Sequence, residues 1–236
     1  MPSWTAAILT LFPEMFPGVL GASLAEKARE KGLWDLELYN IRDFATDKHH
    51  TVDDTPYGGG AGMVLKPDVV ADTLDAVLAR HPERQQWPKV YLSPRGAPLN
   101  QVMLNTFSTQ PGIILLCGRY EGVDQRVLEA YEMTEVSLGD YILAGGEVAA
   151  QVVCEAVIRL LPGAVGDPAT HTEESFSSGL LEYPHYTKPP VWRGAEVPAV
   201  LRGGNHAAIT AWRRRQAEDI TLARRPDLWR CWQENK

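Results

Sequence analysis

Four loop-forming segments of this 236-residue chain combine glycines with charged or polar side chains, a composition typical of ligand-binding loops. The first, Tyr57 to Met63, places four glycines in five positions, which permits positive φ angles and close approach of the backbone to a ligand. No Gly-Lys-Ser/Thr tripeptide follows it, and counting GxGxxG from Gly58 or Gly60 ends on Met63 or Leu65. An NTPase phosphate loop and a dinucleotide fingerprint are therefore excluded.

The same loop matches a third pattern only in its spacing. Gly58, Gly60 and Gly62 reproduce the GxGxG of Rossmann-type methyltransferases. That motif follows a buried strand, whereas here it follows the polar run Asp47 to Pro56, so the context is wrong.

The other three segments each come directly after a predicted strand. Residues 92–96 form a tight turn, residues 117–124 bracket charged side chains with two glycines, and residues 137–147 lead into a long helix. A single segment of this kind is typical of an ordinary strand-to-helix turn. Three in succession at the carboxyl ends of parallel strands predict a ligand pocket.

Alternating strands and helices must position these loops. Apolar runs predict strands over 4–12, 36–39, 89–92, 113–117 and 134–137, and helical spacing predicts helices over 18–31, 67–80, 100–109, 124–131 and 146–161. Repetition of strand and helix predicts an α/β fold, a parallel sheet with helices on both faces.

A change of charge marks a second part of the chain. Up to residue 185 there are 13 basic and 25 acidic side chains, and beyond it 10 basic and 5 acidic. We predict a domain at 1–162, a flexible linker at 163–173 rich in glycine and proline, and a small helical domain at 174–236 with an amphipathic stretch from His206 to Arg225. A basic domain on an acidic body is suited to phosphate backbones, although a solvated helix face would look the same.

Composition narrows the class of protein. No apolar run approaches the length of a membrane span, and the start lacks a signal sequence, so we expect a cytoplasmic protein. Cys117, Cys154 and Cys231 lack disulfide or zinc spacing and are expected to be buried thiols. The histidines show no metal-ligand spacing, so no metal site is predicted.

The segments 57–63, 118–122 and 139–143, with Pro184 to Thr187 and Trp212-Arg213, resemble the TrmD family of bacterial tRNA (guanine-N1)-methyltransferases over essentially the whole chain. The resemblance implies the SPOUT class, with a deep trefoil knot in the sheet domain, a homodimer whose active site lies at the subunit interface, and S-adenosylmethionine as cofactor. The implied reaction methylates N1 of the guanosine immediately 3′ of the anticodon, position 37 of the tRNA.

The resemblance also implies residue roles. A side chain at Gly118 or Gly145 is expected to block the cofactor while leaving the fold largely intact, because the site should be open to solvent. The tRNA-binding residues are expected to be Gly59, Gly60, Arg202, Arg213, Arg214 and Arg215. The cofactor site is expected to comprise Tyr91, Leu92, Ser93, Pro94, Gly118, Glu121, Gly122, Ser137, Leu138, Gly139, Asp140, Tyr141, Ile142, Leu143, Gly145 and Gly146.

Catalysis is where the chain departs from the family pattern. The family places an aspartate before the Ser-Phe dipeptide, and Glu174 stands there in this chain, with Arg159 as its expected partner. Glu174 is predicted to remove the N1 proton and Arg159 to stabilise charge on O6. Glu173 and His171 are alternative bases. The alternative role for Arg159 is structural: a positive charge at the end of a helix interacts favourably with the helix dipole.

Two other functions remain open. A non-catalytic RNA-binding module would need only the basic tail, and the acidic body would give it no advantage. A SPOUT enzyme acting on another RNA position should lack Pro184-His185-Tyr186, which this chain has.

Overall fold

The computed structural model describes residues 3–166 and 174–235. The chain divides into two compact units, Met1–Gly166 and Asp167–Lys236, and each is described by itself. Most of the predicted linker, including the candidate bases His171 and Glu173, lies outside the described residues.

A five-stranded parallel sheet forms the centre of the first unit. Its order is β2 (Trp34–Asn40), β1 (Trp4–Thr10), β6 (Gly112–Cys117), β5 (Lys89–Pro98) and β7 (Thr134–Ser137). Every residue of β6 is buried, as expected for a central parallel strand covered on both faces. The predicted α/β class with a parallel sheet is confirmed.

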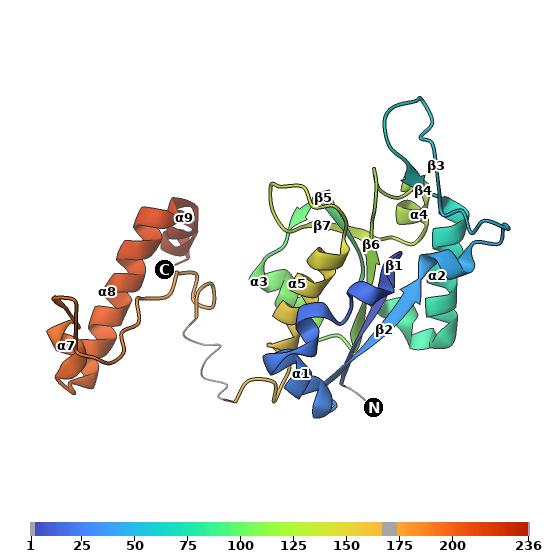
Figure 1. Cartoon of the computed structure of the whole chain (residues 1–236). Helices are drawn as coiled ribbons and strands as arrows, with labels where there is room; N and C mark the ends of the chain where they lie inside the picture. The colour runs from blue at the N-terminus through green and yellow to red at the C-terminus, as the bar shows by residue number, and fades with distance from the viewer. Residues whose placement is uncertain (1–2, 167–173, 236) are drawn as a thin grey trace. The chain divides into compact units, whose positions relative to one another are not determined.

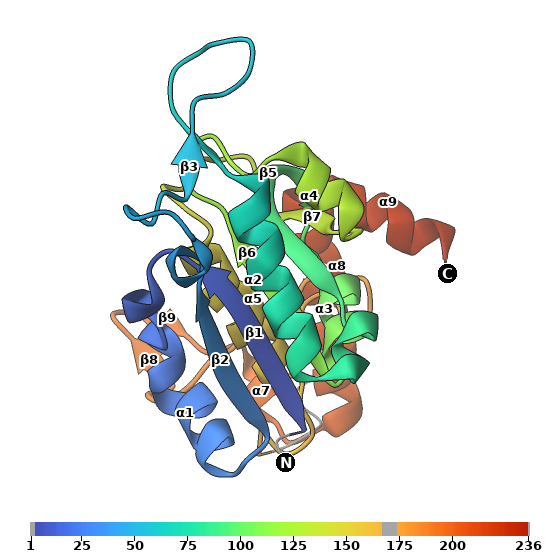
Figure 2. The ribbon, with the colours of Figure 1, turned by 90° about the vertical axis from the view of Figure 1, so that its right-hand side faces the viewer.

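Helices cover both faces of this sheet. One core cluster joins it to α1 (Ser23–Glu30), α3 (Gln101–Ser108) and α5 (Glu147–Ile158), and the other joins it to α2 (Pro67–Arg80) and α4 (Gln125–Ala130). Figure 2 views the sheet with α2 in front of it and α5 behind it. The carboxyl ends of β5, β6 and β7 are thereby left to the loops.

The predicted helix over 18–31 is wrong in its first third. A 3₁₀ turn at Gly18–Gly21 precedes α1, and Ala22 between them is extended, with φ −142°. Gly18 has φ +54°, and a Cβ there would lie 2.5 Å from Oε1 of Gln151 on α5. Contact with α5 therefore overrides the local helical spacing.

A hairpin of β3 (Asp53–Asp54) and β4 (Val64–Leu65) carries the glycine-rich loop, which projects beyond the sheet (Figure 1). Further 3₁₀ turns lie at Pro13–Met15, Ile41–Phe44 and Pro82–Gln86. The hairpin places the glycines beside the carboxyl ends of the strands rather than inside the core.

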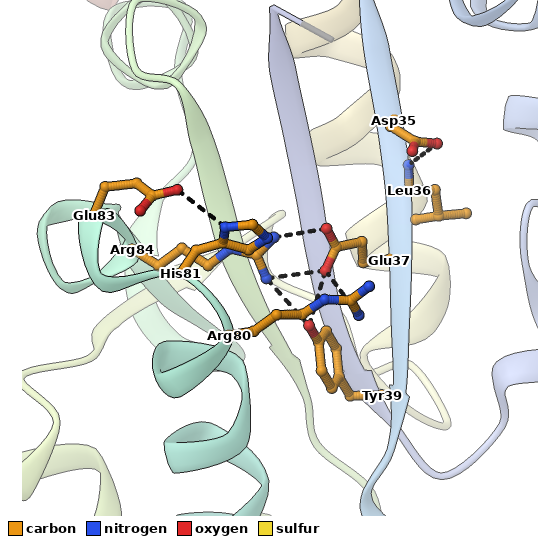
Figure 3. A network of polar contacts seen from close by, with 8 residues as sticks. All are labelled: Asp35, Leu36, Glu37, Tyr39, Arg80, His81, Glu83 and Arg84. Carbon is orange, nitrogen blue, oxygen red and sulfur yellow. Dashed lines mark hydrogen bonds and ion pairs between the residues drawn. The ribbon is translucent and has the colours of Figure 1, made fainter. Parts of the chain in front are cut away.

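A polar network ties β2 to the segment after α2 (Figure 3). Arg84 donates to both carboxylate oxygens of Glu37 at 2.9 and 2.6 Å, and the Tyr39 hydroxyl donates to Glu37 at 2.8 Å. Burial opposes ionisation of Glu37, but the hydrogen bonds from Arg84 and Tyr39 outweigh it and lower its pKa. The Arg84 guanidinium also lies 4.8 Å from the centre of the Trp87 ring.

Within residues 174–235, the second unit holds a two-stranded hairpin and three helices. The hairpin pairs β8 (Val191–Trp192) with β9 (Ala195–Glu196), and the helices are α7 (Ala199–Arg202), α8 (His206–Arg224) and α9 (Pro226–Glu234). The Asn205 side chain caps α8 by accepting from the Ala208 amide. The predicted amphipathic stretch is α8, while the hairpin was not predicted. Among the described residues, no helix is both long and apolar enough to span a membrane.

The cysteine prediction holds for two of the three thiols. Cys117 and Cys154 are buried, whereas Cys231 on α9 is exposed, which corrects the expectation for that residue. Burial raises the pKa of Cys154 to about 12, and it also raises the pKa of Cys117 well above its ordinary value.

Candidate functional site

A cavity of about 340 Å³ lies at the carboxyl ends of β5, β6 and β7, within the size range of small-molecule sites. Three loops line it, from the segments 91–95, 118–125 and 136–149. These are the three loops that the sequence predicted to share one edge of the sheet. The strand order β6-β5-β7 places the three loops side by side.

The first loop is not the tight turn that the sequence predicted. Leu92 and Ala97 both pair with Val136 of β7, so residues 93–96 leave the ladder and return to it within one strand. A Cβ at Gly96 would lie 2.3 Å from the Val136 amide nitrogen, so the return requires glycine. The bulge sends Ser93, Pro94 and Arg95 toward the cavity.

The second loop is packed against the Tyr91 ring. A Cβ at Gly118 would lie 2.8 Å from the Tyr91 ring and hydroxyl, and one at Gly122 would lie 2.9 Å from that hydroxyl. Gly118 is buried, which contradicts the expectation that its position is open to solvent. These glycines therefore admit a neighbouring side chain as well as shaping the cavity.

The glycine-rich hairpin loop supports this second loop from outside. The Glu121 amide donates to Met63 O at 3.0 Å, and the Leu65 amide donates to Gly122 O at 2.9 Å. A Cβ at Gly62 would lie 2.4 Å from Oε1 of Glu121. The loop thus buttresses the cavity wall without lining the cavity itself.

The third loop crosses back onto β6. The Gly146 amide donates to Gly118 O at 3.0 Å, and Gly145 forms an antiparallel bridge with Arg119. A Cβ at Gly146 would lie 2.7 Å from the Cys117 Cα. Only glycine allows the two backbones to approach this closely.

A buried ion pair lies beneath the third loop. The Arg119 guanidinium lies 2.9 Å from Glu147 Oε2, and the two side chains are 18% and 1% exposed. The Thr10 hydroxyl donates to the other carboxylate oxygen at 2.8 Å, and the guanidinium stacks 4.2 Å from the centre of the Phe12 ring. Gly145 is half-buried, and a Cβ there would lie 2.3 Å from Arg119 Nε, so a side chain at this position must displace Arg119.

Every predicted cofactor residue lines the cavity except Asp140, which is exposed and not part of its lining. The sequence reasoning omitted Arg95, Arg119, Tyr120 and Gln125, which also line it. Arg119 and Tyr120 stood inside the quoted 118–122 motif, so position within the loop was a sufficient signal for them. Glu147 was omitted as a site residue because helix position alone did not show its contact with Arg119.

Comparison with known proteins identifies the family. The family model described as tRNA (Guanine-1)-methyltransferase TrmD matches residues 5–231. The chain belongs to the TrmD family. It is 56% identical over 231 residues to a tRNA (guanine-N(1)-)-methyltransferase of Cereibacter sphaeroides, covering 98% of this chain and 93% of that protein. Proteins with the same name from Jannaschia sp. and Bartonella bacilliformis are 57% and 52% identical, covering 96% and 99% of this chain and 92% and 98% of their own lengths.

The arginines expected from the TrmD resemblance to contact tRNA differ in their partners within the second unit. Arg214 pairs with Glu218 at 2.7 Å and stacks on Trp232, Arg213 stacks on Tyr183, and Arg202 pairs with Glu196 at 3.0 Å. Arg215 is exposed. Successive helical residues are about 100° apart, so Arg213, Arg214 and Arg215 leave α8 in different directions, and their contact with tRNA stays a prediction.

The two residues expected in TrmD-type catalysis belong to different units. Arg159 is the C-cap of α5, and Glu174 is half-buried in the second unit. There Glu174 lines a smaller cavity of about 220 Å³ with Tyr183, Arg213 and Arg214. Their joint action stays a prediction. Gly59 and Gly60, also expected to contact tRNA, are exposed at φ +78° and +127°.

Proposed function

We propose that this chain methylates N1 of the guanosine immediately 3′ of the anticodon, position 37, in tRNA, with S-adenosylmethionine as methyl donor. Membership of the TrmD family supports this proposal, together with the cavity formed by the three loops. The single observation that carries it is that the family-motif loops converge on one cavity of ligand size.

The residues that line the cavity fit this cofactor. Gly118, Gly122, Gly145 and Gly146 keep backbone groups accessible along the wall, and Tyr91, Leu138 and Ile142 offer apolar surface for an adenine. When bound, the cofactor supplies an electrophilic methyl group on a sulfonium. We further propose that these loops belong to the trefoil knot of the SPOUT class.

The chain itself must handle a proton and a developing charge. Guanine N1 carries a proton at neutral pH, so its lone pair becomes available only as a base removes that proton. We assign this role to Glu174, with Arg159 stabilising negative charge on O6. The base belongs to the second unit and the arginine to the first.

The homodimer is also a proposal, with each active site shared between subunits. Val148 and Val152 of α5 are 48% and 45% exposed, and Tyr141 and Ile142 beside the cavity are 55% and 80% exposed. Exposed apolar side chains next to a ligand site are suited to cover by a second subunit.

The test is methylation of defined transcripts. The protein is incubated with labelled S-adenosylmethionine and with matched tRNA transcripts carrying G or A immediately 3′ of the anticodon, and the methylated base is mapped. Label at N1 of that G, and none with A, is expected. Label elsewhere would favour a different RNA position, and tRNA binding without transfer would favour a non-catalytic binder.

A further inference from the structure

The charges of the side chains that line the cavity do not sum to zero. Among the described lining residues the charged ones are Arg95, Arg119 and Glu121, a net charge of one positive. Each arginine has an acidic partner outside the lining: Glu135 lies 3.1 Å from Arg95, and Glu147 lies 2.9 Å from Arg119. When Glu135 and Glu147 are included, the net charge of these five side chains is one negative.

The two ion pairs differ in their access to solvent. Arg95 and Glu135 are 62% and 25% exposed, so water and salt screen their charges. Arg119 and Glu147 are 18% and 1% exposed, so their charges act through a medium of low dielectric. The field inside the cavity therefore depends more on Glu147 than on Glu135.

The surroundings of Glu147 stabilise its negative charge. It begins α5, where the helix dipole favours a negative charge, and Thr10 of β1 donates to the carboxylate oxygen that does not face Arg119. Replacing a buried ion pair by apolar side chains is often neutral or stabilising, so stability alone is a weak reason for the pair. A charged ligand in the cavity is a stronger reason for the protein to keep this ion pair.

We propose that Glu147 is a positioning residue that lets the cavity accept a cationic sulfonium ligand, by neutralising the charge of Arg119, a residue that lines the cavity. This inference rests on the proposed use of S-adenosylmethionine. The methyl donor and its demethylated product share every charged group except the sulfonium, which the neutral thioether replaces. Charge on the wall must therefore discriminate between the two ligands, whereas wall shape affects both.

The test measures the dissociation constants of S-adenosylmethionine and S-adenosylhomocysteine by calorimetry on the full chain. Glu147→Gln keeps the size of the side chain and leaves Arg119 uncompensated. Two unit charges about 10 Å apart, in a medium of effective dielectric constant about 20, change an equilibrium constant by roughly tenfold. We therefore expect Glu147→Gln to raise the donor-to-product ratio of dissociation constants by roughly tenfold.

Reciprocal variants separate charge from structure. Arg119→Gln leaves the Glu147 charge alone and should lower the same ratio, and the double variant Arg119→Gln/Glu147→Gln should return it to the parental value. Glu135→Gln is the matched control, because it uncouples a solvent-screened arginine of the same cavity, and it should change the ratio by less than about twofold. Thermal unfolding of each variant shows which ones fold. If Glu147→Gln does not fold, the shift measured for Arg119→Gln decides the test.

The outcomes separate this inference from the function that it rests on. A parent protein that binds neither ligand overturns the proposed function. A parent that binds both, with Glu147→Gln weakening both equally or Arg119→Gln shifting the ratio in the same direction as Glu147→Gln, overturns only the role of Glu147.

Discussion

The Tyr91 ring of β5 lies so close to Gly118, the residue after β6, that a Cβ on Gly118 would be 2.8 Å from it. The contact joins the ends of two neighbouring strands directly beneath the cavity. Tyr91 is buried, and burial raises the pKa of its hydroxyl, so the ring is neutral across the physiological range. The shape of the second loop depends on this contact.

Gly118→Ala should therefore lower stability as well as weaken cofactor binding. Overpacking of this kind costs about 1–3 kcal/mol, because the Tyr91 ring must move to make room for the new Cβ. Calorimetry and thermal unfolding measure the two effects. Gly166→Ala, with nothing within 4 Å of the new Cβ, is the control and should be neutral. An alanine at 118 that left the melting temperature unchanged would contradict the packing argument.

Glu174→Gln should lower the single-turnover methylation rate by roughly tenfold to a hundredfold with cofactor binding unchanged, because size is kept and basicity is lost. Glu174→Asp should preserve or raise the rate, since it restores the shorter arm of the family. The assay is single-turnover methylation of tRNA. If Glu174→Gln matches the parent, Glu173→Gln in the same assay shows whether the neighbouring carboxylate is the base.

Arg215→Ala should flatten the salt dependence of tRNA binding by about one unit of slope, because an exposed arginine that contacts a phosphate releases a counterion. Arg214→Ala should act differently, lowering the stability of the second unit through its lost contacts with Glu218 and Trp232. Binding titrations at several salt concentrations, with thermal unfolding, distinguish them. An identical slope for parent and Arg215→Ala would place the RNA surface elsewhere.

Glu37→Gln should destabilise the first unit by about 3 kcal/mol at pH 7, because it leaves the Arg84 guanidinium buried without its anion. The folded-state pKa of Glu37 is lowered below its ordinary value of 4.5, so its contribution is full above that pH and is lost as the pH falls further. The melting temperatures of parent and variant should therefore converge below about pH 4.5. A gap that stayed constant down to pH 3 would argue against ionisation of Glu37 as the cause.

Native thiol labelling should modify Cys231 alone. Cys117 and Cys154 are buried and their raised pKa values leave little thiolate, the nucleophilic form, at pH 8. Titration with a thiol reagent should report one equivalent for the folded parent, none for Cys231→Ser, and three for the parent in denaturant.

Local patterns of the chain were sufficient for much of the fold. The apolar run Ile113 to Cys117 predicted a doubly covered strand because parallel strands bury both faces, and α2 begins and ends where helical spacing placed it. Because the loops after three parallel strands must lie at one sheet edge, the location of the cavity also followed from the sequence. The individual residues expected in the cofactor site came from the TrmD resemblance, and all of them except Asp140 line the cavity.

Tertiary structure decided the features that join distant residues. Strand order sets which loops touch, and periodicity carries no information about order, so the Tyr91–Gly118 contact and the Arg119–Glu147 pair could not be predicted. The bulge at 93–96 depends on pairing with β7, not on its own residues. The contact of Arg214 with phosphate stays a prediction, because its charge is visible in the sequence. Only the structure shows that its guanidinium also stacks on Trp232, which the packing of α8 and α9 brings beside it, and pairs with Glu218 one helical turn away.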